Sequence, residues 1–269
     1  MKFGLKGLLA IAAVASALVL SGCGEKQADT SKIKVGVMAG AEAQVAEVAA
    51  KVAKEKYGLD VELVTFTDYV TPNAALDDGS IDINAFQHKP YLDQQVTDRG
   101  YKLTIAGNTF VYPIAGYSKQ VKSVDEIQDG ARIAVPNDPT NLGRSLLLLE
   151  QQGLLKLRDG VGLLATVRDI AENPKNITIV ELDAAQLPRS LDDVALSIIN
   201  TTYASSIDLT PQKDGVFVED KESPYVNLIV AREDNVKAEN VQNFVKSYQT
   251  DEVYTAASDI FKGCLLYTS

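Results

Sequence analysis

The feature that most constrains the fold is a strand, a helix and a second strand within residues 33–66. Apolar residues alternate with other residues over 33–37, which is the period-two pattern of a strand. They then recur at helical spacing over 45–53, and a Tyr-Gly pair gives this helix a typical C-terminal end. Residues 61–66 have the pattern of a second strand. Two strands joined by a helix in so short a stretch form a βαβ unit, which implies a parallel sheet covered by helices.

The rest of the chain continues this pattern and indicates two lobes. Helices are expected at 72–78, 90–99, 141–152, 237–249 and 251–262, strands at 81–86, 132–135, 177–182, 194–199 and 226–231, and apolar segments at 102–106 and 109–117. Because the last strand and helices follow a second α/β group, the first lobe is expected to be discontinuous. We assign residues 33–113 and 225–263 to lobe 1 and residues 114–224 to lobe 2. The predicted fold class is α/β: two lobes, each a mostly parallel sheet flanked by helices, with two hinge crossings and a ligand cleft between them.

Residues 1–22 have the pattern of a bacterial lipoprotein signal peptide. Two lysines precede an apolar run of 13 residues that ends in Leu-Ser-Gly-Cys, whereas a helix needs about 20 residues to span a bilayer. Cleavage before Cys23 would make this cysteine a lipid-bearing N-terminus, and residues 23–32 would form a flexible tether. The alternative is an ordinary signal peptide in which the cysteine occurs by chance. We therefore expect a membrane-anchored lipoprotein of the cell envelope, facing the periplasm or the cell exterior.

Charge and residue counts exclude several classes of function. The signal contains two of the 26 basic residues and none of the 36 acidic ones, so residues 23–269 have a net charge of −12. This charge argues against nucleic-acid partners and against electrostatic docking on anionic lipid, which leaves the N-terminal lipid as the membrane link. Two cysteines and one histidine exclude a disulfide framework and a histidine-rich zinc site. No hydrolase, metalloprotease or nucleotide-binding motif occurs, so we predict no enzyme activity, no metal and no cofactor.

Residues 136–144 lie between a predicted strand and a predicted helix, and they contain the first candidate binding residue. Arg144 falls in the first turn of that helix, where free N–H groups and the helix dipole already favour an anion. A cation at this place indicates a negatively charged partner, and an arginine beside helix N–H groups would clamp a carboxylate. The alternative is a surface arginine paired with an ordinary acid, and the spacing alone favours neither.

An aromatic cluster and two asparagines are the other candidates. Phe86, His88 and Tyr91 follow the end of a predicted strand, and Tyr69 from an earlier loop could join them in a pocket. Aromatic rings suit a thioether or an aliphatic chain, and core packing is the alternative for each ring. Two amides near the ends of strands offer donors and acceptors for a zwitterion. These amides belong to Asn200 and Asn227.

Several runs of sequence together carry a resemblance to a known family. They cover nearly the whole mature chain in order: residues 33–37, 84–91, 107–113, 135–144, 187–190 and 223–227. The sequence closely resembles NlpA-type lipoproteins, the substrate-binding lipoproteins of bacterial methionine ABC importers. The resemblance implies a periplasmic-binding-protein fold that closes on methionine and delivers it to a permease with its ATPase subunits. Carried over by position, Arg144 would bind the ligand carboxylate, Asn141, Asn200 and Asn227 would hold the carboxylate and ammonium, and Tyr69, Phe86, His88 and Tyr91 would enclose the thioether.

The chain departs from the family pattern in two places. Residues 264–269 replace the usual C-terminal tail, so we expect them to be non-native and Cys264 to have no function. The segment before Asn200 is about two residues short, which could shift that asparagine. Three alternatives remain: the same fold binding a methionine derivative or methionine-containing dipeptide, a surface-interaction lipoprotein without a transport role, and an enzyme. If His88 must stay neutral in the pocket, we expect binding to decline below about pH 6.

Overall fold

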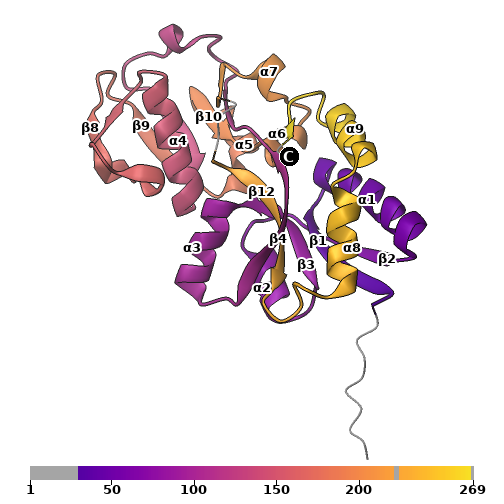
Figure 1. The fold of residues 1–269 in the computed structure, drawn as a ribbon. Helices are drawn as coiled ribbons and strands as arrows, with labels where there is room; N and C mark the ends of the chain where they lie inside the picture. The colour runs from indigo at the N-terminus through magenta and orange to yellow at the C-terminus, as the bar shows by residue number, and fades with distance from the viewer. Residues whose placement is uncertain (1–29, 221–223, 268–269) are drawn as a thin grey trace, which may run out of the picture.

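A computed structural model describes residues 30–220 and 224–267 (Figure 1). Its strands form a six-stranded sheet, a five-stranded sheet and a small two-stranded sheet. The part of the chain carrying the six-stranded sheet is called the first lobe, and the part carrying the five-stranded sheet is called the second lobe. The predicted signal peptide, Cys23 and most of the tether lie outside the described residues. Within the described part, no helix is both long enough and apolar enough to cross a bilayer.

The first lobe is built on the predicted βαβ unit. Its strands are β1 (Lys32–Met38), β2 (Asp60–Phe66), β3 (Ile83–His88), β4 (Leu103–Val111), β12 (Val226–Arg232) and β13 (Leu266–Tyr267), in the order β13-β4-β12-β3-β1-β2. Strand β1 pairs in parallel with both β2 and β3. Strand β12 runs antiparallel to β3 and β4, and β13 runs antiparallel to β4. The sheet is therefore mixed, because β12, the strand by which the chain returns from the second lobe, is antiparallel to β1–β4.

Helices cover both faces of this sheet. They are α1 (Ala41–Tyr57), α2 (Thr71–Asp77), α3 (Lys89–Arg99), α8 (Glu239–Tyr248) and α9 (Asp251–Ile260). Helix α1 packs against α8 and α9, whereas α2 and α3 lie against β3 and β12 (Figure 1). Helix α1 ends at Gly58, whose φ of 66° is in the left-handed region that glycine adopts without a steric penalty. Fully buried side chains such as Val45, Val52 and Phe244 join the helices to the sheet in one core.

The second lobe has a mixed sheet as well. Its strands are β5 (Ala115–Tyr117), β6 (Arg132–Pro136), β9 (Thr178–Leu182), β10 (Leu196–Ile199) and β11 (Phe217–Val218), in the order β11-β5-β10-β6-β9. Its helices are α4 (Pro139–Gln151), α5 (Leu187–Ser190), α6 (Thr201–Ser205) and α7 (Pro211–Asp214), with short 3₁₀ turns at Val124–Glu126, Gly162–Leu164, Val167–Asp169 and Ala184–Gln186. Strands β7 (Lys156–Leu157) and β8 (Ile170–Glu172) form the small sheet. Strands β6, β9 and β10 are parallel, and β5 is antiparallel to both of its neighbours.

Two segments carry the chain between the lobes. One lies between Val111 of β4 and Ala115 of β5, and the other between Val218 of β11 and Val226 of β12. Strand β4 is continuous through residues 107–108, where two separate segments were expected. Its pairing with β12 shifts register around these residues. Bulges therefore let the strand continue through the gap between the two predicted apolar segments.

The C-terminal residues lie against the first lobe. The side chain of Cys264 is 1% exposed and belongs to the same apolar cluster as Tyr112 and Phe261. Strand β13 pairs with β4 through Leu266 and Val111. That residues 264–269 are non-native stays a prediction, but the fold accommodates the described part of this tail without leaving it detached.

Candidate functional site

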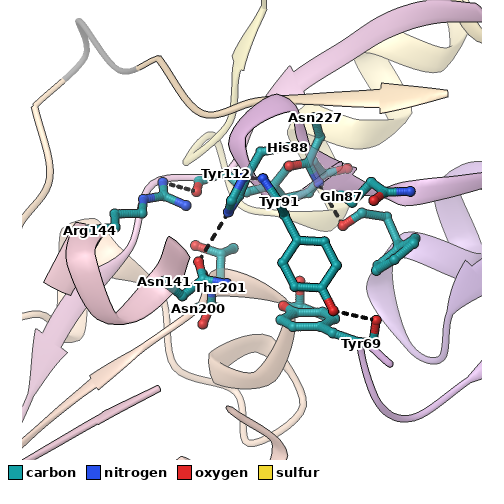
Figure 2. Close-up of a pocket in the computed structure, with 12 residues that line it drawn as sticks. Tyr69, Gln87, His88, Tyr91, Tyr112, Asn141, Arg144, Asn200, Thr201 and Asn227 are labelled. Carbon is teal, nitrogen blue, oxygen red and sulfur yellow. Dashed lines mark hydrogen bonds between the residues drawn. The ribbon is translucent and has the colours of Figure 1, made fainter. Parts of the chain in front are cut away.

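A small pocket lies between the two lobes (Figure 2). All eight residues predicted to bind a ligand line it, together with four that were not predicted. The predicted residues are Tyr69, Phe86, His88, Tyr91, Asn141, Arg144, Asn200 and Asn227, and the additional ones are Gln87, Tyr112, Thr201 and Thr202.

The first lobe contributes an aromatic wall, which consists of Tyr69, Phe86, His88 and Tyr91. The rings of Tyr69, Phe86 and Tyr91 lie with their centroids 5.9–6.3 Å apart, two of the three pairs edge-on. The Tyr91 hydroxyl donates to the Tyr69 carbonyl over 2.8 Å. The ring of Tyr203, from the second lobe, lies 5.0 Å from that of Tyr69. These rings make an apolar surface whose geometry is fixed by contacts among its own members.

His88 joins this wall to the second lobe. It is the last residue of β3 and the N-cap of α3, and its Nδ1 accepts the Tyr91 backbone N–H over 3.1 Å. The proton of a neutral ring is therefore on Nε2, which donates to Asn141 Oδ1 over 3.1 Å. Burial and, next, the charge of Arg144 lower the pKa of His88 to about 3. Protonation of His88 therefore gives no reason to expect weaker binding near pH 6, because burial keeps the ring neutral well below that pH.

The second lobe contributes a polar wall, which consists of Asn141, Arg144, Asn200, Thr201 and Thr202. The side-chain oxygen of Asn141 also accepts from Asn200 Nδ2 over 3.0 Å, and its own Nδ2 donates to Asp138. Asn141 is thus committed to partners in the protein. By contrast, Asn200 Oδ1 is buried and has no hydrogen-bond partner among the described residues. A buried acceptor of this kind is costly without a donor, so it is available to a donor that enters the pocket.

Asn227 approaches the pocket from the start of β12. Its Nδ2 donates to the Phe86 carbonyl over 3.1 Å, and its side chain is seen above the cavity in Figure 2. The short segment before Asn200 therefore does not displace the asparagines: residues from β3, α4, α6 and β12 all reach one cavity.

Arg144 lies deeper in its helix than was predicted. Helix α4 begins at Pro139, and the side chain of Asp138 caps it by accepting the Asn141 N–H over 2.9 Å. Arg144 is therefore in the second turn, and the argument from the first turn of the helix is wrong for it. The guanidinium is nevertheless buried, at 3% exposure, and it points into the pocket from the side of the second lobe (Figure 2).

Arg144 also has an acidic partner. Its Nε donates to Glu219 Oε1 over 2.8 Å, and its Nη2 donates to Glu219 Oε2 and, over 3.0 Å, to the Tyr112 carbonyl. The guanidinium carbon lies 4.2 Å from the centre of the Tyr225 ring. The two hypotheses for this arginine were a clamp for a carboxylate and a surface arginine paired with an acid. The acidic partner is present, but Arg144 is buried and not at the surface. That it clamps a carboxylate stays a prediction.

A second acid, Glu42, lies where the two lobes meet. It is in the first turn of α1, is 3% exposed and accepts a hydrogen bond of 2.5 Å from the Thr202 hydroxyl. Burial raises the pKa of Glu42 to about 8, against the lowering effect of that hydrogen bond. The carboxyl group is therefore protonated at neutral pH.

The residues that sequence reasoning missed differ in the signals they offered. Thr201 and Thr202 directly follow a predicted strand and begin a helix, which is a place where binding residues recur in α/β proteins. Glu219 offered no local signal, because it meets Arg144 across 75 positions of sequence. Only the tertiary structure could join that pair.

Comparison with known proteins shows the family of this chain. Residues 33–267 match the model of a family described as NlpA lipoprotein. The chain is 83% identical over 263 residues to a protein of Vibrio cholerae named probable D-methionine-binding lipoprotein MetQ, with 98% of each chain covered. The chain belongs to the NlpA lipoprotein family.

Solved structures show that this fold is shared. A nutrient-binding protein from Burkholderia cenocepacia, described as bound to methionine, is 51% identical with a TM-score of 0.86. A protein from Coxiella burnetii, described as the periplasmic substrate-binding protein of an ABC transporter, is 47% identical with a TM-score of 0.85. Each match covers 88% of this chain and 100% of the other. The mixed sheets and two lobes of this chain are therefore those of NlpA-type binding proteins.

Proposed function

We propose that this chain is the lipid-anchored substrate-binding component of an ABC importer, which captures methionine between its lobes and delivers it to a permease with its ATPase subunits. The observation that carries the proposal is one pocket with three kinds of group. Arg144 offers a cation for a carboxylate, Asn200 offers an acceptor for an ammonium, and the aromatic wall offers a surface for a thioether. An amino acid with a sulfur-containing side chain satisfies all three.

The names of relatives support methionine over a methionine-containing dipeptide as the ligand. Relatives support the ligand class, since one is named for D-methionine and another is described as bound to methionine. Titration with both enantiomers of methionine would show which one the protein prefers.

We infer that binding closes residues 33–113 and 225–263 over residues 114–224, with the two crossing segments as hinges. Hydrogen bonds between the lobes support this inference: His88 bonds to Asn141, and Thr202 bonds to Glu42. We propose that a lipid on Cys23 anchors the mature protein in the envelope, facing the periplasm or the cell exterior. Lipid analysis of the purified full-length protein would test that anchor.

Calorimetric titration tests the ligand. Residues 24–269, which lack the lipid acceptor, are unfolded, refolded to remove any carried-over ligand, and titrated with L-methionine and then D-methionine. Saturable 1:1 binding at micromolar affinity or tighter, which is about −8 kcal/mol, is the expected result. No heat from a folded sample would redirect the proposal to a methionine derivative or a dipeptide, and chemical turnover of a bound ligand would indicate an enzyme.

A further inference from the structure

The pair formed by Arg144 and Glu219 determines the electrostatics of the pocket. The side chains are 3% and 11% exposed, so solvent screens them little. Glu219 and the Tyr112 carbonyl occupy the Nε and Nη2 donors of Arg144. Within the residues that the structure describes, Nη1 has no hydrogen bond, and an arginine carries two donors on that atom. The guanidinium therefore keeps one end for a ligand while its charge is already balanced at the other.

The remaining pocket groups add almost no charge. Of the twelve lining residues, all within the described part, Arg144 is the one that is charged at neutral pH, because His88 is neutral. Glu42 stands behind Thr202 and is protonated. Asp138 stands behind Asn141 at the partly solvent-exposed start of α4. The buried centre of the site is thus a neutral ion pair.

We propose that Glu219 sets the charge selectivity of this pocket, so that a ligand of zero net charge is accepted and an anion of the same shape is rejected. The proposal rests on the proposed function and adds a specificity-determining residue to it. A zwitterion brings one negative and one positive group and leaves the site neutral. An anion of the same shape places the same carboxylate near Glu219 but lacks the ammonium whose attraction to Glu219 would offset that repulsion, and a buried site of low dielectric opposes the uncompensated negative charge.

The test compares two ligands on two variants. The ligands are methionine and 4-(methylthio)butanoate, which has the same thioether and carboxylate but no ammonium. Glu219→Gln removes the charge and keeps hydrogen-bonding groups for Arg144. Asp192→Asn is the matched control: it removes one negative charge in the same lobe, from an exposed pair with Lys119. Calorimetry gives the dissociation constant of each ligand, and thermal unfolding confirms that each variant folds.

The expected result is a change in the ratio of the two dissociation constants. In Glu219→Gln the preference for methionine over the anion falls by roughly 10- to 100-fold, whereas Asp192→Asn keeps the wild-type ratio. Glu219→Asp retains the carboxylate and is expected to keep most of the preference, so it serves as the second variant if Glu219→Gln does not fold.

Two outcomes overturn the proposal. If both ligands bind more tightly to Glu219→Gln by the same factor, Glu219 merely competes with ligand carboxylates for Arg144. If both bind more weakly by the same factor, Glu219 only positions the guanidinium. Failure of the wild-type protein to bind methionine is a different result, which would reject the proposed function before the ratio could be measured.

Discussion

The two walls of the pocket are built in different ways. The aromatic wall comes from one stretch of the first lobe, residues 69–91, and its rings contact one another. The polar wall comes from α4 and α6 of the second lobe, and its key hydrogen bonds join residues far apart in sequence, such as Asn200 and Asn141 or Arg144 and Glu219. An apolar surface can be assembled locally because dispersion needs only proximity. Buried charges and amides need specific partners, and these arrive from distant segments.

The largest loss of methionine affinity is expected from replacing Arg144, the cation of the polar wall. Arg144→Ala should weaken methionine binding by about 2–5 kcal/mol, because the ligand carboxylate loses its cation and Glu219 remains buried without a partner. Calorimetry measures the loss, with thermal unfolding as a check on folding. Arg158→Ala, which breaks an exposed pair with Asp169, is the control. Affinity within threefold of wild type would remove Arg144 from the binding site.

The next effect concerns Asn200, the pocket amide whose oxygen has no partner among the described residues. Asn200→Ala removes the unpartnered acceptor and one hydrogen bond to Asn141, so binding should weaken by about 1–3 kcal/mol. Asn137→Ala, at an exposed asparagine before α4, should leave the affinity unchanged. If the two variants bind methionine equally well in calorimetry, the free oxygen of Asn200 has no part in recognition.

The stability of the folded protein should depend on pH through Glu42, which lies where the two lobes meet. The pKa of this group is about 8 in the folded protein and 4.5 without burial, so the folded state alone holds its proton between these values. The free energy of unfolding should therefore fall as pH rises from 6.5 to 8, by up to ~1.4 kcal/mol per pH unit. Over this interval His88 is neutral in the folded protein, because its pKa is about 3.

Urea unfolding of Glu42→Gln and Glu47→Gln at several pH values checks this. Glu42→Gln should lose the slope, and Glu47→Gln, at an exposed position of the same helix, should keep it. A wild-type slope in Glu42→Gln would mean that another group carries the proton.

The smallest effect concerns the aromatic wall. Replacing the ligand sulfur by a methylene, as in norleucine, should cost about 0.3–1.5 kcal/mol, because sulfur–aromatic contacts are lost while the apolar shape is kept. Phe86→Leu should reduce the difference between the two ligands by removing one ring. Equal affinity of the wild-type protein for methionine and norleucine would show that this wall recognises shape alone.

Much of the fold followed from patterns that are local in the chain. Hydrophobic periodicity and end signals predicted β1, α1 and β2, since an amphipathic segment must turn its apolar side to a core whatever its neighbours are. The same reasoning could not give the direction of β12 or the pairing of β13. Strand order depends on which edges meet in space, and the periodicity of a single strand is the same in parallel and antiparallel sheets.

For the site, the sequence by itself indicated which residues share one pocket: the aromatic stretch, the arginine and the three asparagines were named from their places at the ends of strands and from a family resemblance, and all line one cavity. The tertiary structure alone decided what each is free to do. It commits Asn141 to protein partners, leaves Asn200 with an open acceptor, keeps His88 neutral and balances Arg144 with Glu219. The physical reason is that the protonation state of a side chain and its hydrogen-bond partners depend on burial and on residues from distant parts of the chain. The sequence next to a residue specifies neither its burial nor these partners.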